Sequence, residues 1–89
     1  MPKTLRSPRQ RRLIDLLVEQ RERAGLTQAQ LAAKLGRYQS VVSSMENGGR
    51  RIDVVELLEI AEVIGLDVHK LIDDLVATPQ SSAPQHAKP

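Results

Sequence analysis

Residues 28–46 contain two short amphipathic segments that meet at a single glycine, Gly36. Apolar residues recur every three or four positions on each side of this glycine, which is the spacing of a helix with one buried face. These residues are Leu31, Leu35, Val42 and Met45. Glycine adopts the positive φ of a tight helix exit at little steric cost. The pattern therefore predicts two short helices joined by one tight turn.

The second of these segments carries hydrogen-bonding side chains on the face opposite its apolar residues. Their lengths suit contacts with the base edges and phosphates of nucleic acid. The residues concerned are Arg37, Tyr38, Gln39, Ser40, Ser43 and Ser44. Two helices with this layout and this polar outer face indicate a helix-turn-helix motif, in which the second helix is the recognition helix.

Capping signals mark the ends of five expected helices. Ser7 followed by Pro8 suits an N-cap and the first helical position, and Gly25 is expected to stop the first helix. Thr27 with Gln30 has the spacing of a capping box before the second helix. The other signals are Asn47-Gly48-Gly49 after a third helix over 39–46, Asp53 with Glu56 before a fourth helix that Gly65 ends, and Asp67 before a fifth.

The domain organisation follows from these helices and their apolar stripes. The expected stripes are Leu13, Ile14, Leu17, Val18 and Ala24 in the first helix, and Val68, Leu71, Ile72 and Leu75 in the fifth. Residues 1–6 read as a loose basic arm, and residues 78–89 are rich in Pro and Ser and read as a disordered tail. The sequence therefore predicts one all-α domain over residues 7–77, a five-helix bundle.

Composition excludes several classes of protein. The chain has no cysteine, so it has neither disulfides nor a thiolate metal site. No apolar run approaches the roughly 18 residues of a membrane span. The basic start leads into an amphipathic segment and does not resemble a signal peptide. We expect a soluble cytoplasmic protein that binds no membrane and no metal, and nothing indicates a cofactor or a small-molecule ligand.

Charge is distributed unevenly along the chain. Residues 1–51 hold eleven Lys and Arg against four acids, a net charge of +7, whereas residues 52–77 hold one Lys against seven acids, a net charge of −6. A basic half that contains the recognition helix is expected of a surface that binds a polyanion. Solvated charged faces are the alternative, and the coincidence with the helix-turn-helix favours nucleic acid.

Catalytic readings find little support in the sequence. His69 and Asp73 lie four residues apart, and two ligands do not make a metal site. Asp73 and Asp74 are adjacent and face different directions on a helix, which prevents them from working as a paired acid and base. The other histidine, His86, lies in the tail, and no histidine is placed to activate the serines. We expect a protein that is not an enzyme.

Taken together, these motifs resemble the phage repressor and Cro-like helix-turn-helix family, the XRE family. The resemblance spans roughly residues 10–76. The segments that carry it are 25–32, Leu35-Gly36, Val42-Ser43, Glu46-Asn47-Gly48, Arg51, Leu58 to Ala61 and Ile64-Gly65-Leu66. The resemblance implies a five-helix bundle that binds double-stranded operator DNA as a homodimer, in a bacterial or phage transcriptional regulator.

The resemblance also assigns roles to single residues. Gln28 matches a glutamine that braces against the backbone phosphate and the recognition helix, and Asn47 matches a turn that lies along the phosphates. Gln39, Ser40 and Ser44 match positions that reach base edges, with Ser43 beside them. Arg21 and Glu46 match a pair that ties the first helix to the end of the recognition helix.

Departures from the family pattern leave some roles open. Tyr38 stands where a Ser or Thr cap is usual, which leaves the start of the third helix open by one or two residues. Its side chain either contacts DNA or packs partly into the core. Arg37 stands where an apolar residue is common and is expected to reach phosphate. Gln20 replaces a frequent leucine and is expected to loosen packing of the first helix. Arg50 and Arg51 follow the Gly-Gly turn and either contact phosphate or only solubilise the surface.

The last two helices carry more apolar residues than one buried stripe uses. Such an excess on a small domain indicates a surface that a partner covers. We expect a homodimer in which Leu71, Leu75 and nearby Ile72 or Val76 are shared between the interface and the core, and which places two recognition helices about 34 Å apart. The alternative function is a protein-interaction adaptor, or an antitoxin-like partner, that binds another chain through the fourth and fifth helices.

Overall fold

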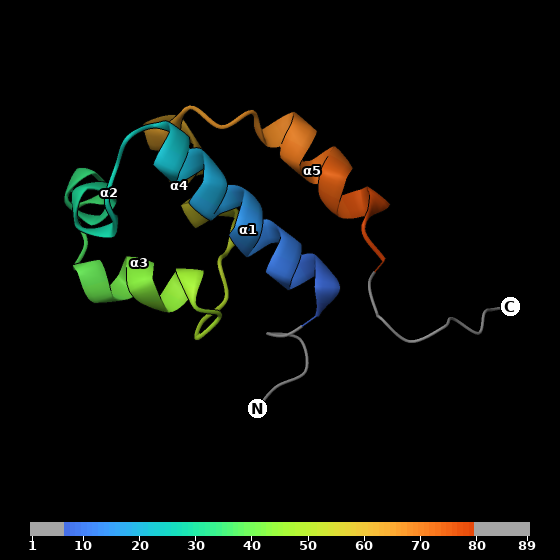
Figure 1. The fold of residues 1–89 in the computed structure, drawn as a ribbon, viewed down its shortest axis with the longest axis horizontal. Coiled ribbons are helices and arrows are strands. Elements are labelled where there is room, and N and C mark those ends of the chain that lie inside the picture. Colours follow the sequence, from blue (N-terminus) through green and yellow to red (C-terminus); the bar gives the residue numbers. More distant parts are fainter. Residues whose placement is uncertain (1–6, 80–89) are drawn as a thin grey trace, which may run out of the picture.

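The computed structural model describes residues 7–79, which form five helices and no strand (Figure 1). In chain order these are α1 (Pro8–Arg23), α2 (Gln28–Leu35), α3 (Gln39–Glu46), α4 (Val54–Ile64) and α5 (Val68–Ala77). The all-α, five-helix class predicted from the sequence is confirmed. The arm predicted at residues 1–6 and the tail residues 80–89 lie outside the described residues.

Four of these helices begin at the side-chain cap that the sequence predicted. The Ser7 side chain accepts a hydrogen bond from the Gln10 backbone N–H, and Asp53 and Asp67 cap α4 and α5 in the same way. At α2 both bonds of the capping box are present, between Thr27 and Gln30. Each cap satisfies a backbone donor that the first helical turn leaves unpaired. Local hydrogen-bonding chemistry therefore sets where these helices start.

Two boundaries differ from expectation. Ala24 follows the last residue of α1 as its C-cap and is exposed, so it is not part of the buried stripe. Thr78, expected as the first tail residue, is anchored to the end of α5, because its backbone N–H and its Oγ1 both donate to the Asp74 carbonyl. Both residues are C-caps, and only Thr78 adds a side-chain hydrogen bond to the last turn of its helix.

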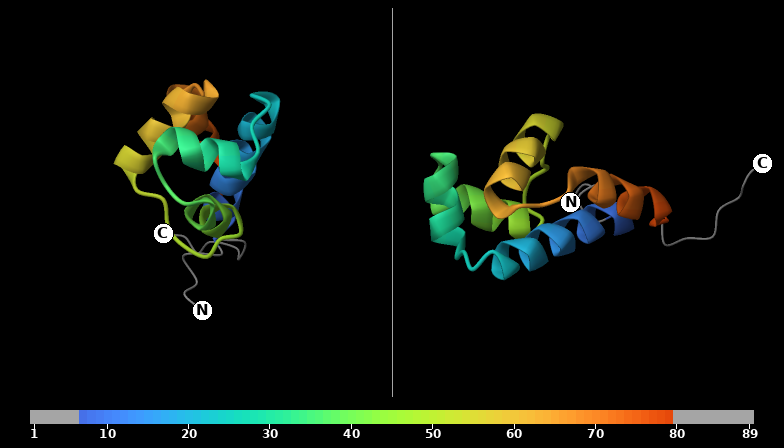
Figure 2. Two further views of the ribbon diagram at one scale, coloured as in Figure 1. Left: turned by 90° about the vertical axis from the view of Figure 1, so that its left-hand side faces the viewer. Right: turned by 90° about the horizontal axis from the view of Figure 1, so that it is seen from above.

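The helices are arranged around α1 (Figure 1). α1 packs against α3 and α5, and α2 packs against α3 and α4. Figure 1 and the right-hand view of Figure 2 show α2 and α3 together at one end of the molecule and α5 beside α1. The helix-turn-helix therefore occupies one end of the domain, and α5 lies away from it.

The core joins all five helices. Ala32 is almost fully buried, and its small side chain suits the place where α2 packs on α3. Each fully buried Leu, Ile, Val or Met contributes about 1.5–3 kcal/mol relative to exposure. The buried residues of the cluster are Leu13, Leu17, Leu31, Ala32, Val42, Met45, Leu57, Ile60, Ile64 and Leu71.

Gln20 makes a contact that the sequence did not suggest. Its Nε2 donates to the Ile64 carbonyl at 3.0 Å and lies 3.5 Å from the Gly65 carbonyl. These carbonyls are at the C-terminal end of α4, where backbone acceptors lack partners within the helix. The polar residue that stands in place of a leucine therefore ties α1 to the end of α4.

Candidate nucleic-acid interface

The turn between α2 and α3 is set by Gly36, which has φ 70° and ψ 33°. This left-handed conformation costs an L-residue roughly 1–2 kcal/mol, and glycine avoids that cost. The next residue, Arg37, donates its backbone N–H to the Ala32 carbonyl at 2.9 Å, which closes the end of α2. Only Arg37 and Tyr38 then separate Gly36 from α3, so the turn directs α3 across α2.

The outer face of α3 is polar. Val42 and Met45 are buried on its inner side. Gln39 and Ser40 are exposed, while Ser43 and Ser44 are half-buried; all four occupy the remaining arc of the helix. The structure thus places the three residues expected to reach bases, Gln39, Ser40 and Ser44, on one surface with Ser43 beside them, and base contact stays a prediction.

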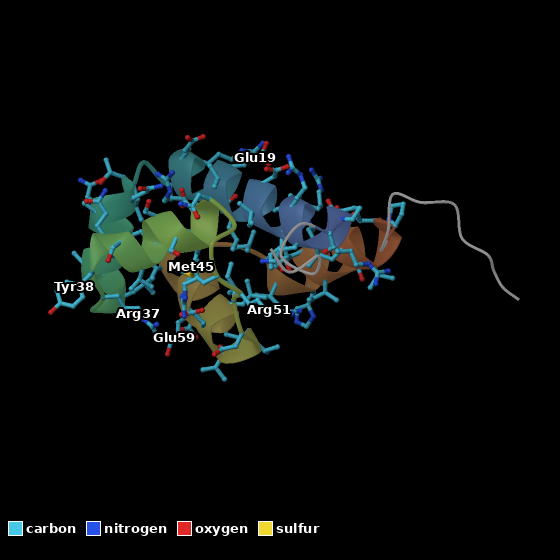
Figure 3. All side chains as sticks on the ribbon, turned by 90° about the horizontal axis from the view of Figure 1, so that it is seen from below. Glu19, Arg37, Tyr38, Met45, Arg51 and Glu59 are labelled. Atoms are coloured by element: carbon cyan, nitrogen blue, oxygen red, sulfur yellow. The ribbon has the colours of Figure 1, made fainter. Side chains whose placement is uncertain are left out.

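Tyr38 is the N-cap residue of α3, and its side chain makes no capping hydrogen bond. It is 83% exposed and projects away from the helices (Figure 3). The alternative that Tyr38 packs partly into the core is therefore wrong. Its position at the start of α3 is compatible with contact to a ligand on the outer face.

A hydrogen-bonded network holds the C-terminal end of α3. Arg21 Nε donates to Glu46 Oε2 at 2.7 Å, and Arg21 Nη2 donates to Glu46 Oε1 at 3.0 Å. Gln28 Nε2 donates to the same Oε1 at 2.9 Å, and Arg21 Nη1 donates to the Leu26 carbonyl at 2.6 Å. The hydrogen bond with Glu46 raises the pKa of Arg21 despite the opposing effect of burial. One carboxylate therefore connects α1, α2 and α3.

The turn after α3 is closely packed. Asn47 Oδ1 accepts a hydrogen bond from the Gly49 N–H at 2.9 Å, and the same N–H lies 2.8 Å from the Ser44 carbonyl. A Cβ at Gly49 would lie 3.0 Å from both Asn47 Oδ1 and Ser44 Oγ. A side chain at position 49 would therefore require Asn47 and Ser44, which we expect to face DNA, to shift by a few tenths of an ångström.

A charged cluster beside α3 is the main feature that sequence analysis missed. Glu56, in the first turn of α4, is only 4% exposed. Its Oε2 accepts hydrogen bonds from Arg37 Nη1 at 2.8 Å and Arg50 Nη1 at 3.1 Å. Arg37 also pairs with Glu59, and the two side chains point toward one another in Figure 3. The sequence showed Glu56 only as part of a helix-start signal.

The arginines at the start of α1 contact α5. Arg9 Nε donates to the Leu75 and Thr78 carbonyls, both at 2.9 Å. Arg12 Nε and Nη2 each donate to one carboxylate oxygen of Asp74 at 2.8 Å. This bidentate pair lowers the pKa of Asp74, with the hydrogen bonds as the largest cause. Part of the positive charge counted in the basic half therefore stabilises the fold.

The residues expected at a dimer interface are placed unequally. Leu71 is buried in the core of the single chain, and Leu75 is half-buried against that core. Ile72 and Val76 are exposed on α5. A second exposed apolar group lies on α4 and consists of Val54, Val55 and Leu58. Of the four predicted residues, Ile72 and Val76 offer the exposed apolar surface.

Within residues 7–79, no helix is long and apolar enough to cross a membrane. Over the same residues, the acidic and histidine side chains form no group of three or more that would hold a metal ion. Arg51 is exposed on the segment between α3 and α4 (Figure 3).

Comparison with known proteins agrees with this geometry. A family model described as helix-turn-helix matches residues 17–71. The chain is 36% identical over 59 residues to an uncharacterized HTH-type transcriptional regulator, y4dJ, of Sinorhizobium fredii (strain NBRC 101917 / NGR234); the match covers 66% of this chain and 77% of that protein. The fold matches an XRE-family like protein from Pseudomonas syringae pv. tomato str. DC3000 with a TM-score of 0.72 and 49% identity, covering 78% of this chain and 84% of that one.

The chain therefore belongs to the helix-turn-helix family of DNA-binding transcriptional regulators. Within that family it is an XRE-family helix-turn-helix protein, as the structural neighbour and the sequence motifs agree. The resemblance noted from the sequence is confirmed.

Proposed function

We propose that this protein is a sequence-specific transcriptional repressor that acts in the cytoplasm and reads an operator half-site with α3 in the major groove. The observation that carries the proposal is the outer face of α3, where Gln39 and Ser40 are exposed and Ser43 and Ser44 lie beside them. A helix in the major groove reads sequence through such side chains. Repression follows where a bound dimer occupies the DNA that a polymerase needs.

The rigid attachment of α3 supports base reading. Glu46, its last residue, is bonded to Arg21 on α1 and to Gln28 on α2. Side chains specify bases only when the helix that carries them is held at a fixed angle, because a shift of about 1 Å breaks hydrogen-bond geometry. We place phosphate contacts on Gln28, Asn47, Arg37, Arg50 and Arg51, and further surface contact on Tyr38.

Selection of bound sequences from a random pool of double-stranded DNA tests the proposal. We expect enrichment of one palindromic site, and binding to that site that weakens steeply as salt is raised, because phosphate contacts release counterions. Gel shifts with the selected site and a scrambled version give the specificity ratio. Recovery of a pool with no preferred sequence would refute sequence-specific binding.

We further propose a homodimer formed through α5. Ile72 and Val76 are exposed residues of α5, and α5 lies away from the end of the molecule that α2 and α3 form (Figure 2), so we expect two copies joined through α5 to leave both α3 helices uncovered. A two-fold dimer presents two α3 helices, which can bind two DNA half-sites that lie one turn, about 34 Å, apart.

Light scattering on matched variants tests the interface. The wild-type protein is expected at twice the chain mass of 9.9 kDa, and an Ile72→Glu/Val76→Glu variant at the mass of one chain. Val54→Glu/Val55→Glu is the matched control, because it places the same charges on the exposed apolar residues of α4. Monomeric wild-type protein, with and without the selected DNA, would refute the dimer.

The exposed apolar residues of α4 favour a second candidate function. Val54, Val55 and Leu58 form part of a helix face that also carries Glu59 and Glu62, so an adaptor or antitoxin-like role through α4 and α5 is the alternative. The two functions differ in what they need from α3. Substitution of Gln39 and Ser40 by Ala abolishes sequence preference in a repressor and leaves an adaptor unaffected.

A further inference from the structure

We infer that Glu56 is a positioning residue for DNA recognition, which holds Arg37 and Arg50 ready for the phosphates of a cognate site. The inference rests on the proposed function, since it takes α3 as the recognition helix. It concerns how strongly the protein discriminates a preferred sequence from other DNA. It gives a role to a buried carboxylate on α4, outside the helix-turn-helix.

The geometry links both ends of α3 through one oxygen atom. Arg37 lies just before the N-cap of α3, and Arg50 follows the turn after α3. Glu56 Oε2 accepts a hydrogen bond from Nη1 of each, at 2.8 Å and 3.1 Å. The segments by which the chain enters and leaves the recognition helix are therefore fixed to the same point on α4.

Both arginines keep donors for a second partner. A guanidinium has five N–H donors in a planar fork, and Glu56 engages one from each arginine. Arg37 lends a further donor to the exposed Glu59. The side chains of Arg37 and Arg50 are both partly exposed. Charge-assisted hydrogen bonds restrain the orientation of a planar guanidinium, so the donors that Glu56 does not engage belong to two restrained and partly exposed side chains.

The carboxylate of Glu56 is only partly hydrogen-bonded, which is unfavourable for a residue that only stabilises the fold. Its Oε1 is buried and has no hydrogen-bond partner among the described residues. A buried carboxylate with one unpaired oxygen bears a desolvation cost that an apolar side chain would not. This cost indicates that the carboxylate is kept for what it does to the two arginines.

Glu56 has two effects on DNA binding, one limited to cognate DNA and one common to all DNA. It orders two long side chains in advance, which removes an entropy cost from binding when phosphates lie at matching positions. It also reduces the positive charge near α3, which weakens attraction to any phosphate backbone. The first effect requires the register of a preferred site, whereas the second acts on all DNA. Glu56 therefore raises the ratio of specific to non-specific affinity.

The test compares Glu56→Gln with Glu62→Gln, a matched control on an exposed position of the same helix that removes the same charge. Affinities are measured for the selected site and for its scrambled version. For Glu56→Gln we expect the specificity ratio to fall about tenfold, mainly through weaker binding to the selected site, because two side chains lose their order. Glu62→Gln is expected to change both affinities by the same factor and leave the ratio unaltered.

Two further variants test whether Glu56 acts on the specificity ratio through its contacts with Arg37 and Arg50. Glu56→Asp keeps the charge but is too short to reach both arginines, so the ratio is expected to fall again. In an Arg37→Gln/Arg50→Gln background, Glu56→Gln should leave the ratio unchanged, because its effect passes through the arginines. A fall of equal size in that background, or equal ratios for Glu56→Gln and Glu62→Gln, overturns the inference. Wild-type protein with no preferred sequence would instead overturn the proposed function.

Discussion

Glu46→Ala is expected to destabilise the domain by about 3 kcal/mol because it removes the partner of a buried arginine. The side chains of Arg21 and Glu46 are only 10% and 12% exposed. Breaking one side of a buried ion pair costs about 3–5 kcal/mol, since the remaining charge keeps its desolvation penalty. We take the lower end of this range because Arg21 Nη1 retains its hydrogen bond to the Leu26 carbonyl.

Thermal unfolding followed by circular dichroism measures this effect. In a domain of this size each 1 kcal/mol shifts Tm by roughly 4–8 °C, so Glu46→Ala should lower Tm by about 12–24 °C. Glu19→Ala is the matched control, because Glu19 pairs with Arg23 at 3.8 Å on the exposed side of α1, with side chains 60% and 69% exposed. Exposed pairs contribute about 0–1 kcal/mol, so this variant should melt close to the wild type.

A double variant identifies the stranded charge as the cause. Arg21→Met/Glu46→Leu removes both charges and fills similar volume, and we expect it to recover most of the lost stability. If Glu46→Ala melts no lower than Glu19→Ala, the reasoning from burial is refuted. If the double variant is less stable than Glu46→Ala, the stabilisation lies in the hydrogen bonds themselves and not in avoidance of a lone charge.

Three other perturbations test the site and the fold. Gln39→Ala is expected to cost about 1–3 kcal/mol of binding on the selected site and little on scrambled DNA; equal losses in a gel-shift titration would exclude base reading. Gly49→Ala places a Cβ 3.0 Å from Ser44 Oγ, so it should reduce DNA affinity by a larger factor than Gln30→Ala, which alters the exposed capping box; equal factors would show that the turn is not at the interface. The lowered pKa of Asp74 implies stability that is present above its unfolded pKa of about 3.9 and is lost as pH falls through the folded-state value. Asp74→Asn should therefore have a lower Tm than the wild type near neutral pH, and the two Tm values should converge in acid. A Tm difference that stays the same across this pH range would contradict the prediction.

The helix boundaries were predictable because their causes are local. The capping box of Thr27 and Gln30 forms across three residues, and both of its hydrogen bonds are present. Gly36 adopts the left-handed conformation that the turn requires. These interactions involve neighbouring backbone groups whose geometry hardly depends on the rest of the fold. The α3 helix runs from Gln39 to Glu46, the range expected from the sequence, although Tyr38 provides no side-chain cap.

The partners of the charged residues were much harder to predict. The pairing of Arg21 with Glu46 was expected only from the family resemblance. Arg12 and Asp74 lie 62 residues apart in sequence, and no spacing rule connects them. The charge count placed Arg12 in the basic half of the chain and Asp74 in the acidic half, whereas the structure brings the start of α1 and the end of α5 together. Arg37 was expected to reach phosphate, and the structure adds a buried intramolecular partner.

Sequence alone determined which segments are helical, where they begin, and that the outer side of α3 is polar, because capping and helical periodicity operate within one or two turns. Tertiary structure alone decided that Glu56 joins Arg37 to Arg50, and that Leu71 is buried while Ile72 is exposed. Hydrogen bonds and ion pairs act over a few ångströms. Whether two residues come within that range depends on how the helices pack, and each helix face meets solvent or core only once the whole bundle has assembled.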